Sequence, residues 1–470
     1  MKRLFFFAVY VTQVCWGWGE VGHHLIARSA VEILRTHPAL KSKTELADTH
    51  ALKSFLEVFK SKQYQEGHVA NIPDTYWRNL DQGFSEDGTL LGSPSHYLDS
   101  EELLTLMKLK DSTEPRAKIP LTYAETKKMF PQISSFYKTV GSLPWRAQQF
   151  SDLYAASLKK QVEAKCDSSK KSELATRISL TFAGLLTHFT GDVSMPYHTT
   201  MDHDAIAVGQ KGIHSYFEQD LVSELELNNL FAKVTERARY LLKAEEPDNS
   251  TPPLPILKER AKALYSESVN THSTSALMMV LIADSFSLIE KLRQLDYTYA
   301  IASLDEALTM PECRNLAVVR ELKNQFDKLE EAPKAIFGKV KILSLPSEHE
   351  DKKIQSACRR KPSTKVDQNG ELSEIGKTVA QWHEELIIER LALSAALTAE
   401  IWVQEWLKAG SPAFCSTYLY AHKPSFVSPT DDKCYGYALQ EDPKDFIKKD
   451  GKSALNSLKN RRQLTDCVSF

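Results

Sequence analysis

Apolar residues recur at helical spacing along most of this chain, whereas strict alternation of apolar and polar residues is scarce. Apolar positions three and four residues apart predict helices over residues 22–34 and 172–192, the second with a broad apolar surface. Pro196 ends the second helix, because proline lacks the amide hydrogen that a helix interior requires. Further helices are predicted over residues 216–230, 274–295 and 379–407. Since residues 340–345 are the best candidate strand, we expect a mainly α fold.

The N-terminus has the pattern of an export signal. Met1-Lys2-Arg3 is basic, and the apolar run Leu4–Val14 is too short to span a bilayer. The small residues Cys15 and Gly17 precede Trp18, which is typical of a cleavage site. We therefore expect a secreted or periplasmic product, with a retained N-terminal anchor as the alternative. No later segment has the roughly 18 uninterrupted apolar residues that a membrane helix needs.

Composition limits the function classes. The chain has 470 residues, of which 42% are hydrophobic, and a net charge of −2. It can bury a full core, as one large domain with an appendage or as two domains. The near-neutral charge counts against a protein that coats nucleic acid, because no overall positive field attracts a polyanion.

Cysteine usage agrees with export. Removal of Cys15 with the signal leaves an even number of cysteines, which in an exported protein suggests disulfides of open pairing. None has the C-x2-C spacing of a cysteine zinc site. They are Cys166, Cys313, Cys358, Cys415, Cys434 and Cys467.

Five histidine and acidic residues within 31 positions give the strongest chemical signal. His188 and Asp192 stand four residues apart, as do His214 and Glu218, so each pair lies on one face of a helix. His198 falls between the pairs. Imidazole and carboxylate groups together are ligands that zinc prefers. A buried His–Asp ion pair would explain the first pair alone, but the whole set predicts more than one metal ion, as in polynuclear zinc sites with phosphoester chemistry.

Weaker candidates lie upstream of this set, and one lies within it. The expected mature chain begins with Trp18-Gly19-Glu20-Val21-Gly22-His23, while Asp74 follows a proline and His96 precedes a tyrosine. Taken alone, Asp74 is typical of a turn or helix cap, and His96 of a surface histidine. His203, between two aspartates, is interpreted as part of a solvated loop.

Together these motifs resemble the superfamily that joins bacterial zinc-dependent phospholipase C with the single-strand-specific zinc nucleases of fungi and plants. The segments W-G-E-V-G-H, G-D-V-S-M-P-Y-H and G-I-H-S-Y-F-E stand where that superfamily has zinc ligands. The resemblance covers roughly residues 18–295 and implies a compact multi-helix fold of the phospholipase C and nuclease type. The implied metal ligands are Trp18, His23, Asp74, His96, His188, Asp192, His198, His214 and Glu218.

The resemblance also implies three zinc ions. Asp74, His96, His188 and Asp192 would hold the first; His198, His214 and Glu218 the second; Trp18, through its α-amino and carbonyl groups, and His23 the third. Asp192 would bridge the first and third ions. Asp74 and Asp192 would be the catalytic carboxylates, with Asp74 orienting or deprotonating the nucleophile.

The sequence has features of both branches of the superfamily. Four residues between Trp18 and His23 resemble the nucleases, whereas Glu218 and the short gap before His214 resemble the phospholipases. We expect a secreted phospholipase C that acts on a phospholipid headgroup at a membrane surface. A nuclease or 3'-nucleotidase acting on single-stranded nucleic acid or nucleotides is the alternative, and a non-catalytic zinc-stabilised helical binding protein is the third.

The expected organisation follows from these assignments. Residues 1–17 form the signal peptide, and residues 18–300 form the zinc-dependent phosphoesterase domain. Residues 301–470 form a C-terminal helical extension with a cysteine-containing tail.

Overall fold

A computed structural model describes twelve parts of the chain. These are residues 18–41, 49–60, 69–74, 93–106, 119–133, 136–164, 170–205, 213–244, 251–265, 273–289, 291–292 and 374–414. The described residues are 81% helical and include no strand, which confirms the mainly α fold. Their one isolated bridge is antiparallel and joins Leu98 to Gly141. The predicted signal peptide, the candidate strand and all the cysteines lie outside the described residues.

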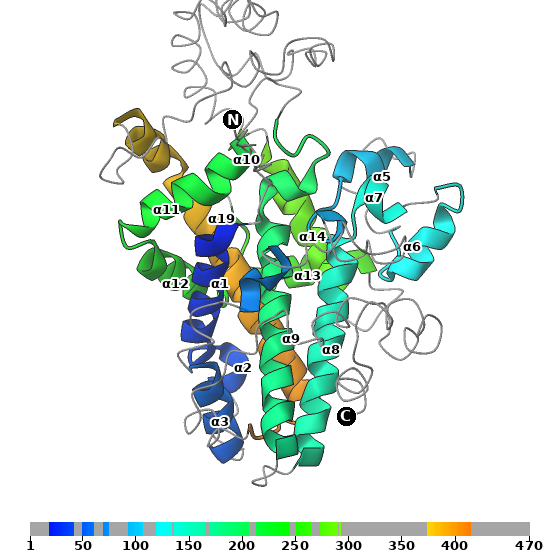
Figure 1. The fold of residues 1–470 in the computed structure, drawn as a ribbon, viewed down its shortest axis with the longest axis vertical. Coiled ribbons are helices and arrows are strands. Elements are labelled where there is room, and N and C mark those ends of the chain that lie inside the picture. Colours follow the sequence, from blue (N-terminus) through cyan, green and yellow to red (C-terminus); the bar gives the residue numbers. More distant parts are fainter. Residues whose placement is uncertain are drawn as a thin grey trace, which may run out of the picture.

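The described elements are all helices or helical turns (Figure 1). The longer helices are α1 (Gly19–Leu34), α3 (Thr49–Phe59), α8 (Leu143–Ala164), α9 (Lys170–Ser194), α12 (Leu230–Leu241), α13 (Leu254–Tyr265), α14 (Thr274–Ser287) and α19 (Glu374–Lys408). The shorter α-helices are α2 (Pro38–Lys41), α5 (Ser100–Leu106), α6 (Tyr123–Met129), α7 (Phe136–Val140), α10 (Ile213–Ser215) and α11 (Leu221–Glu226). Turns of 3-10 helix are η1 (Val69–Asn71), η5 (Ser93–Ser95) and η7 (Pro196–Thr199), and η9 (Tyr216–Asp220) is a π-helical turn.

Most predicted helices form close to their expected bounds. α1 covers residues 19–34, α9 residues 170–194 and α19 residues 374–408. α9 ends two residues before Pro196, as a proline at that place requires. The single helix predicted over residues 216–230 is instead divided. The π-helical turn, α11 and a reversal at Asn229, whose φ is 62°, precede α12.

The arrangement places α9 within the helical bundle. It contacts α8, α19, α14 and α1, and α8 runs alongside it for most of its length (Figure 1). The apolar face predicted for α9 is buried, with Leu185, Leu186 and Phe189 fully covered. The helix that carries two of the predicted metal ligands is therefore supported by neighbours from both ends of the described chain.

The late helix α19 shares one hydrophobic core with the helices of the predicted phosphoesterase domain. Its Trp402 ring lies 4.5 Å from the ring of Phe59, and its Trp406 stacks on Phe55 at 4.7 Å. The predicted boundary between residues 300 and 301 falls outside the described residues, and this division stays a prediction. Among the described helices, none has both the length and the apolarity that crossing a bilayer requires.

Candidate metal centre

Segments from five parts of the described chain deliver the predicted side-chain ligands to one region. His23 comes from α1, Asp74 from the turn after η1, and His96 follows η5. α9 carries His188 and Asp192 on one face, since they are four residues apart. The remaining ligands follow: His198 in η7, His214 in α10 and Glu218 in η9.

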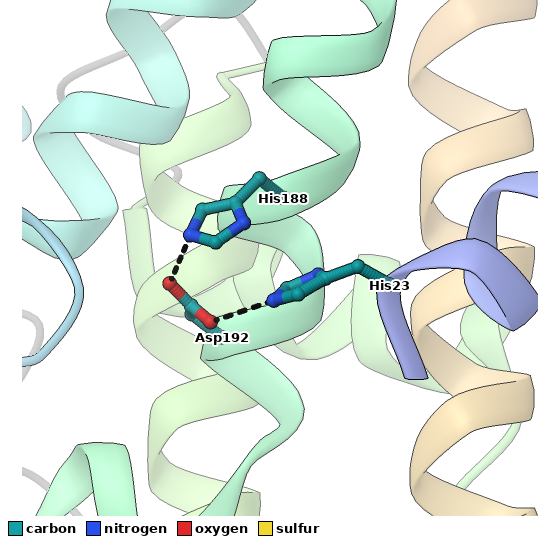
Figure 2. Close-up of side chains that lie close together, drawn as sticks. All are labelled: His23, His188 and Asp192. Atoms are coloured by element: carbon teal, nitrogen blue, oxygen red, sulfur yellow. Dashed lines mark ion pairs between the residues drawn. The ribbon is translucent and has the colours of Figure 1, made fainter. Parts of the chain in front are cut away.

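Asp192 lies at the centre of the first group. Figure 2 shows its carboxylate between the rings of His188 and His23. Asp192 Oδ2 lies 3.1 Å from His188 Nε2, and Asp192 Oδ1 lies 3.5 Å from His23 Nε2. The two imidazole rings stack with their centroids 4.1 Å apart. Three potential ligand atoms from two helices thus converge on one small volume.

His96 and Asp74 extend this group. His96 Nδ1 lies 3.0 Å from Asp192 Oδ2 and 2.9 Å from His188 Nε2. Asp74 Oδ1 lies 3.6 Å from His96 Nδ1, and Asp74 Oδ2 lies 3.7 Å from His23 Nε2. Asp74, His96 and His188 therefore offer ligand atoms that could share one ion. The two upstream residues that the sequence marked only weakly lie at the same place as the strong motif.

A second group consists of His198, His214 and Glu218. Glu218 Oε2 lies 3.0 Å from His214 Nε2 and 3.9 Å from His198 Nε2. His198 Nδ1 lies 3.5 Å from Asp192 Oδ1, so the two groups adjoin. Glu218 stands in a π-helical turn, a rare local geometry that is frequent at functional sites.

The residues fit bound cations. None of the eight side-chain ligands is more than 3% exposed. Within the described residues, neither ring nitrogen of His23 makes a hydrogen bond, nor do His96 Nε2 and Asp192 Oδ1. Buried polar atoms without partners cost free energy, and bound metal ions would satisfy them. These buried histidine and acidic groups can therefore hold metal ions.

The orientation of His188 supports the same interpretation. Its Nδ1 atom donates a hydrogen bond to the carbonyl oxygen of Ala70, at 2.8 Å. Because a carbonyl only accepts, this bond leaves the Nε2 atom unprotonated in the neutral ring and directed to Asp192 and His96. Such a second hydrogen bond fixes the tautomer of a metal-binding histidine.

Protonation in this cluster follows from burial and close pairing. Burial lowers the pKa of His23 and of His96, which favours the neutral rings that bind metals. Burial alone would raise the pKa of Asp192, but His188 and His198 hold it well below its usual range. Burial would lower the pKa of His188, and Asp192 outweighs it and raises that pKa. The central carboxylate is therefore ionised near neutral pH.

Trp18 lies at the start of α1, and its side chain is fully buried. The indole nitrogen donates to Gly191 O at 2.9 Å and to Ser194 Oγ at 3.1 Å. The Trp18 carbonyl accepts a hydrogen bond from Gly22 N at 3.0 Å. The indole thus fixes this end of α1 against α9. Coordination by the main-chain atoms of Trp18 stays a prediction.

A glycine in α9 allows the close approach of His23. A Cβ atom at Gly191 would lie 2.9 Å from His23 Cε1 and Nδ1, and 3.1 Å from Ile26 Cδ1. Real Cβ atoms essentially never approach other atoms within 3.0 Å. Gly191 is a residue of the G-D-V-S-M-P-Y-H motif, but the sequence alone does not show that His23 is the residue it accommodates.

His203 differs from its interpretation as a solvated residue. Its Nδ1 donates to Tyr197 O at 3.0 Å, its Nε2 lies 3.2 Å from Asp99 Oδ1, and its ring lies 4.7 Å from that of Tyr97. Burial lowers the pKa of His203 to about 4, and burial, with Glu101 and Glu102 nearby, raises the pKa of Asp99 to about 8. His203 is thus a half-buried neighbour of the cluster and belongs to neither ligand group.

Comparisons with known proteins add no relative. No protein-family model matches the chain, and neither curated proteins nor solved structures give a match. The resemblance to zinc phospholipases C and nucleases therefore depends on the motifs and on the residue order given above.

Proposed function

We propose that this protein is a secreted zinc-dependent phosphodiesterase. One observation carries the proposal: predicted ligands spread from His23 to Glu218 converge in adjoining buried groups around Asp192. Mixed imidazole and carboxylate donors suit zinc better than magnesium or calcium, which prefer oxygen ligands alone.

The charges of such a centre suit a phosphate ester. Three zinc ions would bring about six positive charges, of which Asp74, Asp192 and Glu218 would offset about three. Bound zinc would supply this charge and lower the pKa of a water molecule toward neutrality. An anionic phosphodiester would be attracted to the remaining positive charge.

The side chains have separate roles in this proposal. Asp192 lies between His23 and His188 on one side and His198 on the other, so it holds the two groups at a fixed spacing. Asp74 accepts or directs the proton of the attacking water, as a carboxylate at hydrogen-bonding distance from a nucleophile can. The buried surroundings exclude bulk water and strengthen the electrostatic interactions.

The proposed substrate is a phosphoglyceride, cleaved at its glycerol–phosphate bond. Glu218 and the short gap between His198 and His214 carry this assignment, through the resemblance to phospholipase C. The four-residue gap between Trp18 and His23 favours the nuclease branch, so single-stranded nucleic acid is the second candidate substrate.

A side-by-side assay tests the proposal. Full-length chain processed before Trp18 is given phosphatidylcholine micelles and, separately, single-stranded DNA, at equal protein and zinc. We expect diacylglycerol release without DNA cleavage. DNA cleavage without diacylglycerol would establish the nuclease instead, and bound zinc with neither activity would establish a non-catalytic zinc protein.

Two variants make the assay specific for the cluster. Asp192→Asn preserves the shape of the side chain but removes the central negative charge, so we expect both zinc and activity to be lost. Glu400→Gln is the matched control, because Glu400 forms a buried pair with His37 at 3.1 Å outside the cluster. This control should retain zinc and activity near neutral pH. Full zinc content and turnover in Asp192→Asn would contradict the proposal.

A further inference from the structure

The late helix α19 presents a polar stripe to α9. Arg390, Ser394, Thr398 and Trp402 stand at intervals of four residues, so they share one face of the helix. Ser394 Oγ pairs with Ser194 Oγ, and Thr398 Oγ1 pairs with Thr190 Oγ1. Trp402 Nε1 donates to the carbonyl of Ala183 at 3.1 Å. As α19 advances from 390 to 402, its partners on α9 recede from 194 to 183, so the helices run antiparallel.

Arg390 occupies the end of this stripe that lies beside the ligand-bearing end of α9. It is fully buried, and its Nε donates to the carbonyl of Ser194 at 3.0 Å. Its Nη1 donates to Asp284 Oδ2 at 2.6 Å, and its Nη2 donates to Ser285 Oγ at 2.8 Å. One guanidinium group therefore joins α19, α14 and the last residue of α9.

The carbonyl groups at the end of α9 are satisfied from outside the helix. The last carbonyls of a helix have no partner within it. Here Arg390 bonds to Ser194 O, Ser285 Oγ donates to Val193 O at 2.7 Å, and Trp18 Nε1 donates to Gly191 O. These carbonyls belong to the residues on either side of Asp192. Three segments distant in sequence therefore fix the backbone that carries the central ligand.

We infer that Arg390 is a positioning residue for the metal centre. This inference rests on the proposed metal site. A buried charge is costly to desolvate, and an apolar side chain of similar volume often supports stability as well or better. The planar fork of arginine does what an apolar residue cannot: it fixes three acceptors at set directions. Its role is to hold the backbone of α9 so that Asp192 keeps its place between the two ligand groups.

The test measures zinc affinity separately from stability. Zinc binding to the processed full-length protein is measured by competition with a chromophoric chelator, at a temperature where circular dichroism shows each variant folded. Unfolding by urea is measured in excess chelator. For Arg390→Met we expect affinity for zinc to fall at least about tenfold, the usual scale for groups that orient metal ligands. Arg390→Lys should recover part of this loss, since lysine retains the charge but loses the fork.

Arg237→Met is the matched control. Arg237 of α12 is half-buried and also forms an ion pair with α19, at 2.7 Å from Oε1 of the buried Glu389, but this pair does not involve the end of α9. The Arg237→Met variant should be less stable than the wild type in chelator but should bind zinc with unchanged affinity. Ser285→Ala gives a milder second variant, because it removes the bond to Val193 O while retaining the Arg390–Asp284 ion pair. Its affinity should fall in the same direction.

The outcomes separate this inference from the proposed function. Wild-type zinc affinity in folded Arg390→Met, Arg390→Lys and Ser285→Ala would overturn the positioning role while leaving the metal site intact. An equal loss of affinity in Arg237→Met would overturn it too, because the effect would then follow from stability alone. Failure of the wild-type protein to bind zinc would instead overturn the proposed function.

Discussion

Gly191→Ala adds one methyl group to α9, the helix that carries Asp192, and should displace His23, a predicted ligand on α1. The new Cβ would lie 2.9 Å from His23 Cε1 and Nδ1. Carbon atoms are in favourable contact at about 3.5–4.0 Å, so the His23 ring must move by at least roughly 0.5 Å. Zinc–ligand distances tolerate changes of only about 0.2 Å. The variant should therefore lose the ion that depends on His23.

The same change has a small effect on the metal-free protein. Overpacking costs about 1–3 kcal/mol. Replacing glycine with alanine in a helix gains up to about 1 kcal/mol. In excess chelator we therefore expect Gly191→Ala to lose no more than about 2 kcal/mol of unfolding free energy. Its loss of zinc should be larger than this change in stability explains.

Zinc content by atomic absorption, zinc affinity by chelator competition and urea unfolding in chelator together form the assay. The control is a double-mutant cycle with His23→Ala. In the double variant the added methyl group enters space that the imidazole has left, so it should cause no further loss of zinc and should partly restore stability. Normal zinc content and affinity in folded Gly191→Ala would refute the reasoning from close packing.

Two further predictions concern stability. Removing metal with a chelator should lower the free energy of unfolding, by about 2.7 kcal/mol for each site that had been held at a 100-fold excess of zinc over its Kd; a melting temperature independent of zinc would contradict this. Burial alone would raise the pKa of Glu400, but hydrogen bonds from His37 and Lys258 lower it to about 2. A depressed carboxyl pKa stabilises the protein above the unfolded value of about 4.5, and this contribution is lost as the pH falls toward 2. In excess chelator, the free energy of unfolding of the wild type should therefore exceed that of Glu400→Gln by about 3 kcal/mol at pH 6 and by almost nothing near pH 2. If urea unfolding showed the same difference at both pH values, the prediction would be wrong.

The helices with strong apolar periodicity were predictable because each buries one face against neighbours. The 25 residues of α9 show such a pattern over many turns, whereas α19 is buried on all sides over residues 389–403 and was predictable from its length and its long apolar run. The division of the segment after His214 was not predictable from periodicity. A π-helical turn keeps the polarity pattern of a helix and changes only its winding, and Asn229 marks a reversal inside an apparently continuous stretch.

The residues that form the candidate site were predictable from the sequence, but the residues that hold them in place were predictable only in part. The four-residue spacing identifies His188, Asp192, His214 and Glu218 as candidate ligands. Asp74 and His96 have no local signal of metal binding, and they were found only because their order along the chain matches the family that the chain resembles. Arg390 was not identified, because its partners Ser194 and Asp284 lie 196 and 106 residues away in sequence. Spacing within one helix reveals a shared face, but it does not say which distant backbone that face will meet.

The antiparallel pairing of α19 with α9 has a consequence for biosynthesis. A ribosome delivers every predicted side-chain ligand well before it delivers Arg390 and Trp402, so a nascent chain possesses these eight donors while α9 still lacks one of its neighbours. Long-range pairings of this kind form slowly, because the loop between the partners must close first. The proposed metal centre would therefore be loaded at the last stage of folding, and for an exported protein that stage would follow translocation. The zinc supply of the compartment that receives the chain, rather than that of the cytoplasm, would then determine how much of it becomes loaded.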